Sequence, residues 1–221
     1  MRELAAAHPA LKGSTIFLKQ VKPPSSVKRL LQPASMNAKL GAGKTHITKG
    51  KWKGMPMYQL TLEERKTCPK TCDQWRTCYG NNMPFANRID HEDKDFYATL
   101  DAELATLSTK HAQGFVVRLH VLGDFYSVKY VDWWTKKLSE HTGLRVFGYT
   151  HRLPDSPIGR AIQRFNDAGA WIRWSDIGDL PMAANVAGPG IVCPQQTGRT
   201  ASCLTCGLCW AIMKPIQFLR H

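Results

Sequence analysis

Cysteine is missing from most of this 221-residue chain. All seven cysteines fall in two short stretches, residues 68–78 and 193–209, and none lies elsewhere in the sequence. Cysteines that only fill a hydrophobic core would be scattered over strands and helices. The clustering therefore indicates a shared chemical role.

Long apolar segments are also missing. No stretch approaches the roughly 18 apolar residues that a membrane-spanning helix requires. The N-terminal sequence MRELAAAHPALKG has neither the apolar core nor the cleavage signature of a secretory signal peptide. We therefore expect a cytoplasmic protein with no membrane contact, in a compartment where reducing conditions keep thiols free.

Acidic residues are nearly absent from the first quarter of the chain. Residues 1–53 hold eleven lysines and arginines but one acid, Glu3, so this segment carries +10 of the formal net charge of +13. It lacks sustained periodicity, which predicts an irregular basic arm, wrapped over the rest or partly mobile. Such an arm can bind nucleic acid through its phosphates. A solvated surface is the alternative, and the scarcity of arginine disfavours a mitochondrial presequence.

A phosphate-binding loop is absent as well, although residues 38–45 (AKLGAGKT) match a relaxed form of its pattern. That loop works only between a buried strand and a helix. Pro33 and polar residues occupy the place of the strand, and the following HITKGKWKG is a poor helix. We therefore do not expect nucleotide hydrolysis at this loop.

The two cysteine sets have the spacings C-x3-C-x5-C and C-x9-C-x2-C-x2-C. An odd number of cysteines in a reduced chain disfavours disulfides and favours thiolate ligation of zinc or an iron–sulfur cluster. The second set holds four ligands, enough to close a site: Cys193, Cys203, Cys206 and Cys209. The first set holds three: Cys68, Cys72 and Cys78. Three ligands leave one coordination position open, and open positions are where metal chemistry takes place.

Zinc is the alternative to iron at these sites. Zinc sites usually draw on two separated pairs of ligands, whereas three cysteines at x2 spacing are more typical of a chain wrapped around a [4Fe-4S] cluster. The three-cysteine set would become a structural zinc site if His46, His91 or a carboxylate supplied the fourth ligand. Cys193 can also be assigned to the first set, which gives other partitions of the seven thiols.

From residue 55 the sequence alternates between apolar strands and helices of crossover length. The pattern predicts strands at 55–62, 115–121, 144–150 and 170–175, and helices at 83–110, 128–140 and 158–169. It predicts an α/β fold in which parallel βα repeats form a partial, incomplete TIM-like barrel. The predicted units are a basic arm (1–53), a core with the three-cysteine loop (54–190) and a four-cysteine tail (191–221).

Polar side chains occur in strands that should be apolar on both faces of a parallel sheet. Arg118 and His120 share one face of their strand by alternation, and Tyr149 and Arg173 lie in the next two strands. A buried arginine needs an anionic partner or a polar cavity. Because ligands bind at the carboxyl ends of parallel strands, we expect these side chains to line a pocket for an anionic small-molecule substrate.

A three-cysteine loop directly after the first strand of a βα series, closing in Cys78-Tyr79, resembles the radical S-adenosylmethionine enzymes. In that family three cysteines hold a [4Fe-4S] cluster, and its fourth iron binds S-adenosylmethionine. The resemblance implies cofactor contacts from Gly123, Asp124 and Ser175, an auxiliary cluster on the four later cysteines, and an electron-donor protein as a partner. This chain departs from the usual C-x3-C-x2-C spacing, and its Leu122-Gly123-Asp124 turn has one glycine and no proline.

The segments GDFYSVKYVDWW and RVFGYTHR resemble more specifically the small phage and prophage proteins of the gene product 88 type. This resemblance covers residues 36–212. Residues and resemblance together predict an iron–sulfur protein with two clusters, one of them open for redox or radical chemistry. The alternative is a non-catalytic binding protein, in which zinc or clusters are structural and the basic arm binds nucleic acid or a protein partner.

Overall fold

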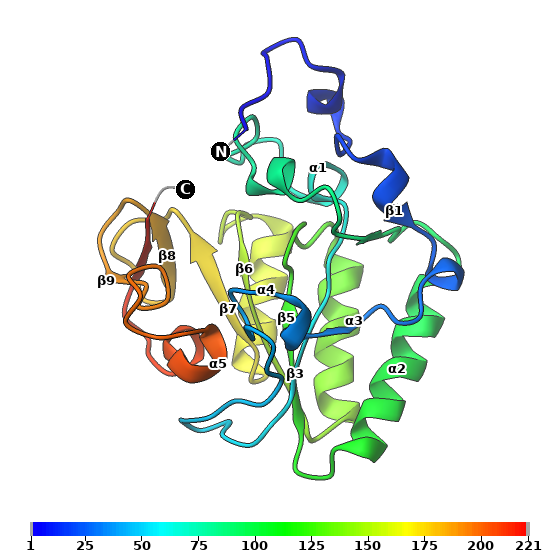
Figure 1. Ribbon diagram of the computed structural model, residues 1–221, viewed down its shortest axis with the longest axis vertical. Coiled ribbons are helices and arrows are strands. Elements are labelled where there is room, and N and C mark those ends of the chain that lie inside the picture. Colours follow the sequence, from blue (N-terminus) through cyan, green and yellow to red (C-terminus); the bar gives the residue numbers. More distant parts are fainter. Residues whose placement is uncertain (1, 220–221) are drawn as a thin grey trace.

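The computed structural model describes residues 2–219, and a mostly parallel eight-stranded sheet lies at its centre (Figure 1). The strand order is β2-β3-β5-β6-β7-β8-β10-β9. Their bounds are β2 Gln32–Pro33, β3 Met57–Gln59, β5 Phe115–Leu119, β6 Leu144–Thr150, β7 Trp171–Ser175, β8 Ala183–Val186, β9 Ile191–Val192 and β10 Ile216–Phe218. Only β2 and β3 pair antiparallel. Within residues 2–219, β2 and β9 are edge strands, so the sheet is not closed into a barrel.

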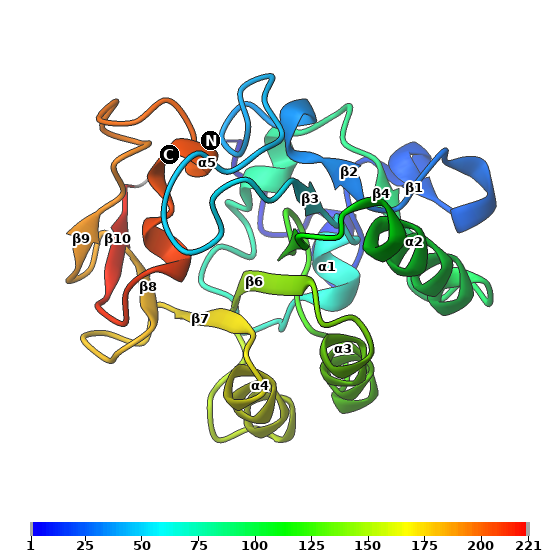
Figure 2. The ribbon, with the colours of Figure 1, turned by 90° about the horizontal axis from the view of Figure 1, so that it is seen from below.

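Three long helices pack on one face of the sheet. They are α2 (Phe96–Lys110), α3 (Val128–Glu140) and α4 (Pro157–Asp167), and Figure 2 shows them on the same side. Serine side chains cap two of them, because Ser127 accepts from the backbone N–H of Tyr130 and Ser156 from that of Gly159. The larger hydrophobic core lies between these helices and the sheet, and it includes Leu104, Val117 and Phe165.

The opposite face of the sheet, called the inner face below, is covered by irregular chain. The loop at residues 37–54 and the C-terminal segment with α5 (Cys203–Cys206) lie there (Figure 2). A second apolar cluster joins them to the strands: Ala34, Leu40, Ile47, Trp52, Met57, Val116, Val121, Phe147, Leu204 and Trp210. The rings of Trp52 and Trp210 stack at 5.5 Å between centroids. The side chains of this face therefore lie between the sheet and the two irregular segments.

The basic N-terminal segment is folded against the rest of the chain. It contains a two-residue strand, β1 (Val21–Lys22), which pairs in parallel with β4 (Arg88–Ile89), and several 3₁₀ turns. Its first residues contact the three-cysteine loop, since the Trp75 indole N–H donates to the carbonyl of Leu11 and Arg76 bonds to that of Leu4. This segment is thus part of the support of the cysteine loop.

The sequence predicted the α/β alternation and the long helices, but two of its details were wrong. Residues 83–95, expected to begin a helix, form turns and β4, and α2 starts at Phe96. Pro84 disfavours a helix there, and the buried side chain of Arg88 bonds to Glu64 instead. The segment after residue 175 adds β8, β9 and β10 to the sheet, although no strand was predicted beyond that residue.

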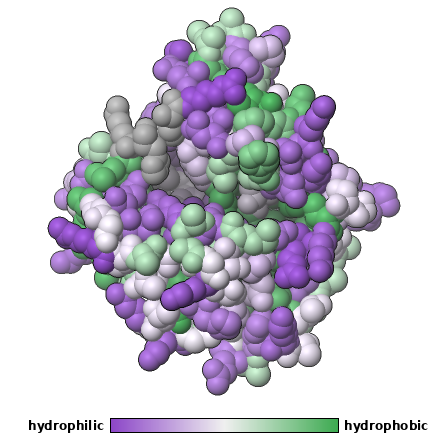
Figure 3. Space-filling view, viewed as in Figure 1, coloured by the Kyte–Doolittle hydropathy of each residue, from purple (hydrophilic) through white to green (hydrophobic). Residues whose placement is uncertain are grey.

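No helix in the described part of the chain is long and apolar enough to cross a bilayer. The surface seen in Figure 3 is mainly hydrophilic, with apolar residues in small patches. Exposed apolar side chains within residues 2–219 include Phe85 at 91 % and Met36 at 71 % exposure.

Candidate metal centre

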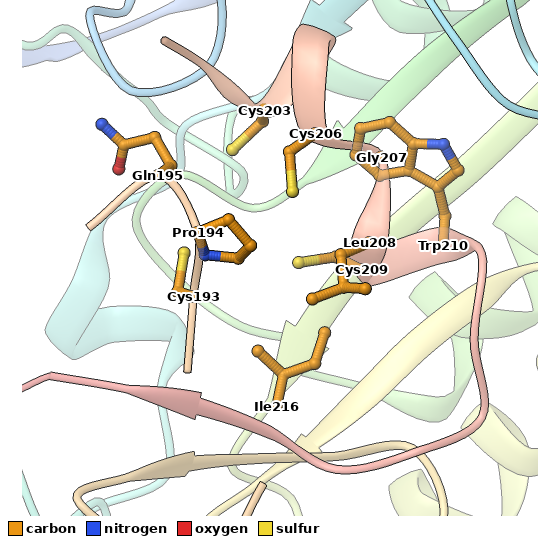
Figure 4. Close-up of a pocket in the computed structure, with 10 residues that line it drawn as sticks. All are labelled: Cys193, Pro194, Gln195, Cys203, Cys206, Gly207, Leu208, Cys209, Trp210 and Ile216. Atoms are coloured by element: carbon orange, nitrogen blue, oxygen red, sulfur yellow. The ribbon is translucent and has the colours of Figure 1, made fainter. Parts of the chain in front are cut away.

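The four later cysteines line one cavity, although Cys193 is ten residues from the other three. Figure 4 shows the sulfur atoms of Cys193, Cys203, Cys206 and Cys209 turned toward a common space, which Pro194, Leu208, Trp210 and Ile216 also border. Backbone pairing brings them together, because the Cys193 N–H donates to Gln217 of β10 and the Cys203 N–H to Lys39 of the inner-face loop. The predicted four-thiol set therefore converges in the fold.

The distances between these sulfur atoms bear on whether a zinc ion or an iron–sulfur cluster suits the site. A tetrahedral zinc ion with zinc–sulfur bonds of about 2.3 Å holds its sulfur ligands about 3.8 Å apart. Among residues 2–219, no three possible ligand atoms that include a cysteine sulfur lie within 4.8 Å of one another. An iron–sulfur cluster attaches each thiolate to a different iron, so its ligands stand farther apart. Four thiols on one cavity, with no three of them that close, fit the donor set of an iron–sulfur cluster.

The short helix α5 carries Cys203 and Cys206, and Cys209 follows in a 3₁₀ turn. The side chains of Ser202 and Thr205 form a reciprocal capping box at the start of α5, and Gly207 ends the helix with φ +72°. Burial raises the pKa of the Cys203 thiol to about 12 and also raises the pKa of Cys209. In the metal-free chain these two thiols are therefore protonated at neutral pH, so metal binding to them would release protons.

Arg173 anchors the same segment to the sheet. Its side chain is fully buried in β7 and donates hydrogen bonds to the backbone carbonyls of Cys209 (2.7 Å), Lys214 (3.1 Å), Ala183 (3.3 Å) and Ile212. A guanidinium that bonds to four carbonyls has little capacity left for a ligand. The interpretation of Arg173 as a substrate contact is corrected here, because the side chain holds the four-cysteine segment in place.

The three-cysteine loop leaves the carboxyl end of β3 through α1 (Glu64–Thr67), as the sequence predicted. Burial raises the pKa of Cys72 to about 12 and also raises the pKa of Cys68. The Cys78 thiol and the Asp124 carboxylate raise both pKa values further. Thiols that affect one another electrostatically lie close together. The three cysteines and Asp124 thus share one region at the carboxyl edge of the sheet.

A buried ion pair that the sequence analysis missed supports this loop. Arg88 bonds to the Glu64 carboxylate at 2.8 Å and to the carbonyls of Gly80, Met83 and Ala86 beyond Cys78. Arg65 bonds to the Trp75 carbonyl within the loop. Single charged residues in a turn-rich stretch gave no signal for this network, since its members meet only in the fold.

The Gly123-Asp124 turn contacts the loop directly. A Cβ on Gly123, which has φ +90°, would lie 2.7 Å from Thr67 Oγ1, so only glycine fits this close approach. The Asp124 N–H donates to the same hydroxyl, next to Cys68. The Asp124 carboxylate is buried and accepts from Phe125 N, Thr150 Oγ1 and His151 N at 2.7–2.8 Å. Its main observed role is to tie the ends of β5 and β6 to the cysteine loop.

The carboxyl edge also gathers a His/Asp group that was not predicted. Ligand atoms of Asp73 in the three-cysteine loop, His151 after β6 and Asp176 after β7 lie within 4.8 Å of one another. His151 Nε2 stands 3.5 Å from the Asp176 carboxylate. Ser175, the last residue of β7, precedes this group and is half-buried. The cysteine loop, the end of β6 and the end of β7 thus meet at one edge of the sheet.

Arg118 and Tyr149 meet on the inner face. The guanidinium of Arg118 lies 5.6 Å from the centroid of the Tyr149 ring, and the Tyr149 hydroxyl donates to the thiol of Cys209. Burial raises the pKa of the nearby Tyr79 phenol, and the charge of Arg118 opposes the increase. These contacts place Arg118 between the two cysteine sets.

His120 lies elsewhere than expected. Strand β5 ends at Leu119, so strand alternation no longer fixes the direction of the next side chain. The His120 ring stacks on Tyr130 of α3, with its Nε2 2.9 Å from the Tyr130 hydroxyl, within the helix-side core. Burial lowers the pKa of His120 to about 3, so the ring is neutral at physiological pH. The expectation that it shares a face with Arg118 is wrong.

Comparison with known proteins identifies a family for this chain but no individual relative. The model of the Gene product 88 family matches residues 28–158, more than half of the chain. The chain therefore belongs to the Gene product 88 family. The matched region contains the three-cysteine loop and Arg118 and ends before the four-cysteine set. No curated protein and no solved structure matches the chain.

The stability of the chain should respond differently to removal of the charge of Arg118 in β5 and of Arg173 in β7. Arg173→Met leaves four carbonyls without their donor and should lower the free energy of unfolding by about 3 kcal/mol or more. Arg118→Met removes a cation with no protein hydrogen bond in residues 2–219 and should leave stability unchanged or increase it. Urea unfolding of both variants measures this, and an equal loss from both would contradict the assignment.

His120 should contribute to acid sensitivity. Its pKa in the folded state is depressed to about 3, below the ordinary value of 6.5, so unfolding takes up a proton below pH 6.5. Stability present above pH 6.5 is then lost as the pH falls, by about 2 kcal/mol between pH 7 and pH 5. His120→Gln should lose about that much less over the same interval in urea unfolding. If the free energy of unfolding changes with pH in the same way in both proteins, His120 is not a neutral buried histidine.

Proposed function

We propose that this chain is an iron–sulfur protein with two cysteine-ligated clusters. Cys193, Cys203, Cys206 and Cys209 would hold a closed [4Fe-4S] cluster, and Cys68, Cys72 and Cys78 a second one with an open coordination position. The observation that carries the proposal is the convergence of four thiols on one cavity, no three of which lie within 4.8 Å of one another. The arrangement of the three-cysteine loop at the carboxyl edge of the sheet supports the open site.

The open site suits redox chemistry or radical chemistry with S-adenosylmethionine. When bound, such a cluster supplies the electron for reductive cleavage of that cofactor. Residues of the chain hold the backbone next to this site. Arg152 donates a hydrogen bond to the Thr67 carbonyl just before Cys68, and the Gly123 turn packs against Thr67. Ser175 and the backbone of the turn are the proposed cofactor contacts. We interpret the open, mostly parallel sheet with these sites as an incomplete barrel of this type.

The second candidate is a non-catalytic protein that binds nucleic acid. Lys44, Lys49 and Lys53 are exposed on the inner-face loop, beside the four-cysteine segment, because Thr48 N–H donates to the Leu204 carbonyl at 3.1 Å. Exposed lysines can neutralise the negative charge of phosphate groups. In this alternative, zinc or clusters only stabilise the fold. Metal analysis separates it from the first proposal.

Iron and sulfide analysis of the anaerobically purified chain is the primary test. We expect about eight irons per chain, as two four-iron clusters require. Cys206→Ser and Cys72→Ser should each remove about half of the iron, and the double variant most of it, because the two sets are separate. Ser202→Thr, which keeps the cap hydroxyl next to Cys203, is the control and should retain full iron. Stoichiometric zinc with no iron would contradict the proposal and favour the binding protein.

The radical branch has its own test. The reduced, cluster-loaded chain should release 5′-deoxyadenosine from S-adenosylmethionine, and Cys72→Ser should abolish the release because it removes a ligand of the open site. Cys206→Ser should retain at least part of it. Absence of 5′-deoxyadenosine from fully loaded, reduced protein would remove the radical branch and leave the cluster assignment standing.

A further inference from the structure

Arg118 differs from the other buried or half-buried arginines of the site. Arg65, Arg88, Arg152 and Arg173 each donate hydrogen bonds to carbonyl or carboxylate oxygens of the protein. Within residues 2–219, Arg118 donates none, and its Nε is enclosed without an acceptor. Burial of a guanidinium without an acceptor costs folding free energy unless a bound anion compensates its charge.

The missing partner is not a protein carboxylate. The ion pairs of the described residues do not include Arg118, although ten others are formed. The Arg118 guanidinium instead contacts an aromatic ring, that of Tyr149, whose centroid lies 5.6 Å away.

The four-cysteine cavity does not explain Arg118 either. The residues that line that cavity come from the segments 193–195, 203–210 and Ile216, and Arg118 is not among them. Tyr149 lies between, since its ring faces the Arg118 guanidinium and its hydroxyl donates to Cys209. The guanidinium is thus directed to a place beside the four-thiol site and outside it.

A second cation borders the same region. Lys39 lies over the ring of Phe218 at 4.9 Å, and that ring packs edge-on against Tyr149 at 5.6 Å. Two cations and two aromatic rings, drawn from β5, β6, β10 and the N-terminal segment, therefore face the same part of the inner face.

We propose that Arg118, assisted by Lys39, binds the carboxylate or phosphate group of a small-molecule substrate between the two cysteine sets. The planar fork of a guanidinium with free N–H groups matches such anions in a bidentate manner. Arg118 is half-buried, and its Nε is enclosed without an acceptor. This inference names the substrate class of the proposed iron–sulfur site and rests on that proposal for the reaction, but the binding step requires only the described residues.

The experiment is isothermal titration calorimetry of the full-length, anaerobically purified chain with inorganic phosphate and, separately, with succinate. Physiological ionic strength, about 0.15 M, suppresses weak binding to the basic surface. We expect one saturable site for at least one of the two anions. Arg118→Gln should weaken binding by about tenfold or more, because a charge-assisted pair of hydrogen bonds is lost. Arg118→Lys should recover only part of it.

Arg145→Gln is the matched control. Arg145 comes from the neighbouring strand β6, and its guanidinium is already bonded to the carbonyls of Thr142 and Leu144. This variant should bind the anion as the unaltered chain does. Iron content is measured for every variant, so that loss of a cluster and loss of anion binding are read separately.

Loss of anion binding in Arg118→Gln with unchanged iron content supports the proposal. Anion binding that depends on Arg118 in a chain without iron also supports it, while the proposed iron–sulfur function fails. No saturable binding to the unaltered chain, or equal binding by Arg118→Gln, overturns it. Loss of iron together with anion binding in Arg118→Gln also overturns it, because Arg118 would then be a partner of the cluster.

Discussion

The hydrogen bonds from Arg173 to the backbone of the C-terminal segment are the contacts on which the rest of the site depends. One guanidinium from β7 joins the sheet to carbonyls from Cys209 to Lys214. Those carbonyls belong to irregular chain that has few hydrogen bonds of its own. By holding them, Arg173 fixes the cysteines of α5 and residue 209 opposite Cys193, and the stack of Trp210 on Trp52 closes the same face with apolar contact.

Two supports of different kinds thus position the two cysteine sets. The four-thiol set depends on a cation that binds carbonyls, whereas the three-thiol loop depends on the buried pair of Glu64 and Arg88 and on the close approach of Gly123 to Thr67. The inner face of β5 and β6 lies between the sets. Arg118 is the one arginine there whose hydrogen-bonding capacity the described residues leave unused, which is why the substrate proposal is centred on it.

Most of the fold and part of the site could be predicted from the sequence. Strand runs such as residues 144–150, the cap at Ser127 and the apolar stripe of α2 are local patterns, and they gave the parallel βα series. Short strands such as β9 and β10 lack a local signature, and their pairing comes from tertiary contact. The helix expected from residue 83 failed because the Arg88 side chain is used in the Glu64 network.

The cysteine sets were visible as spacings, but the roles of the arginines were not. Arg118 and Arg173 both lie within strands of the same sheet, and only the fold shows that Arg173 bonds to four carbonyls while Arg118 bonds to none in the described chain. Likewise, alternation put His120 beside Arg118, because the sequence does not show that β5 ends one residue earlier. Residue roles that depend on partners distant in sequence require the structure.

X-ray absorption at the iron edge, on the chain purified without oxygen, examines the central claim most directly. The account predicts sulfur ligation together with iron neighbours around each iron, in the unaltered chain and also in a chain that retains only the four later cysteines. Iron without iron neighbours, or a sulfur-ligated zinc ion in its place, would contradict it.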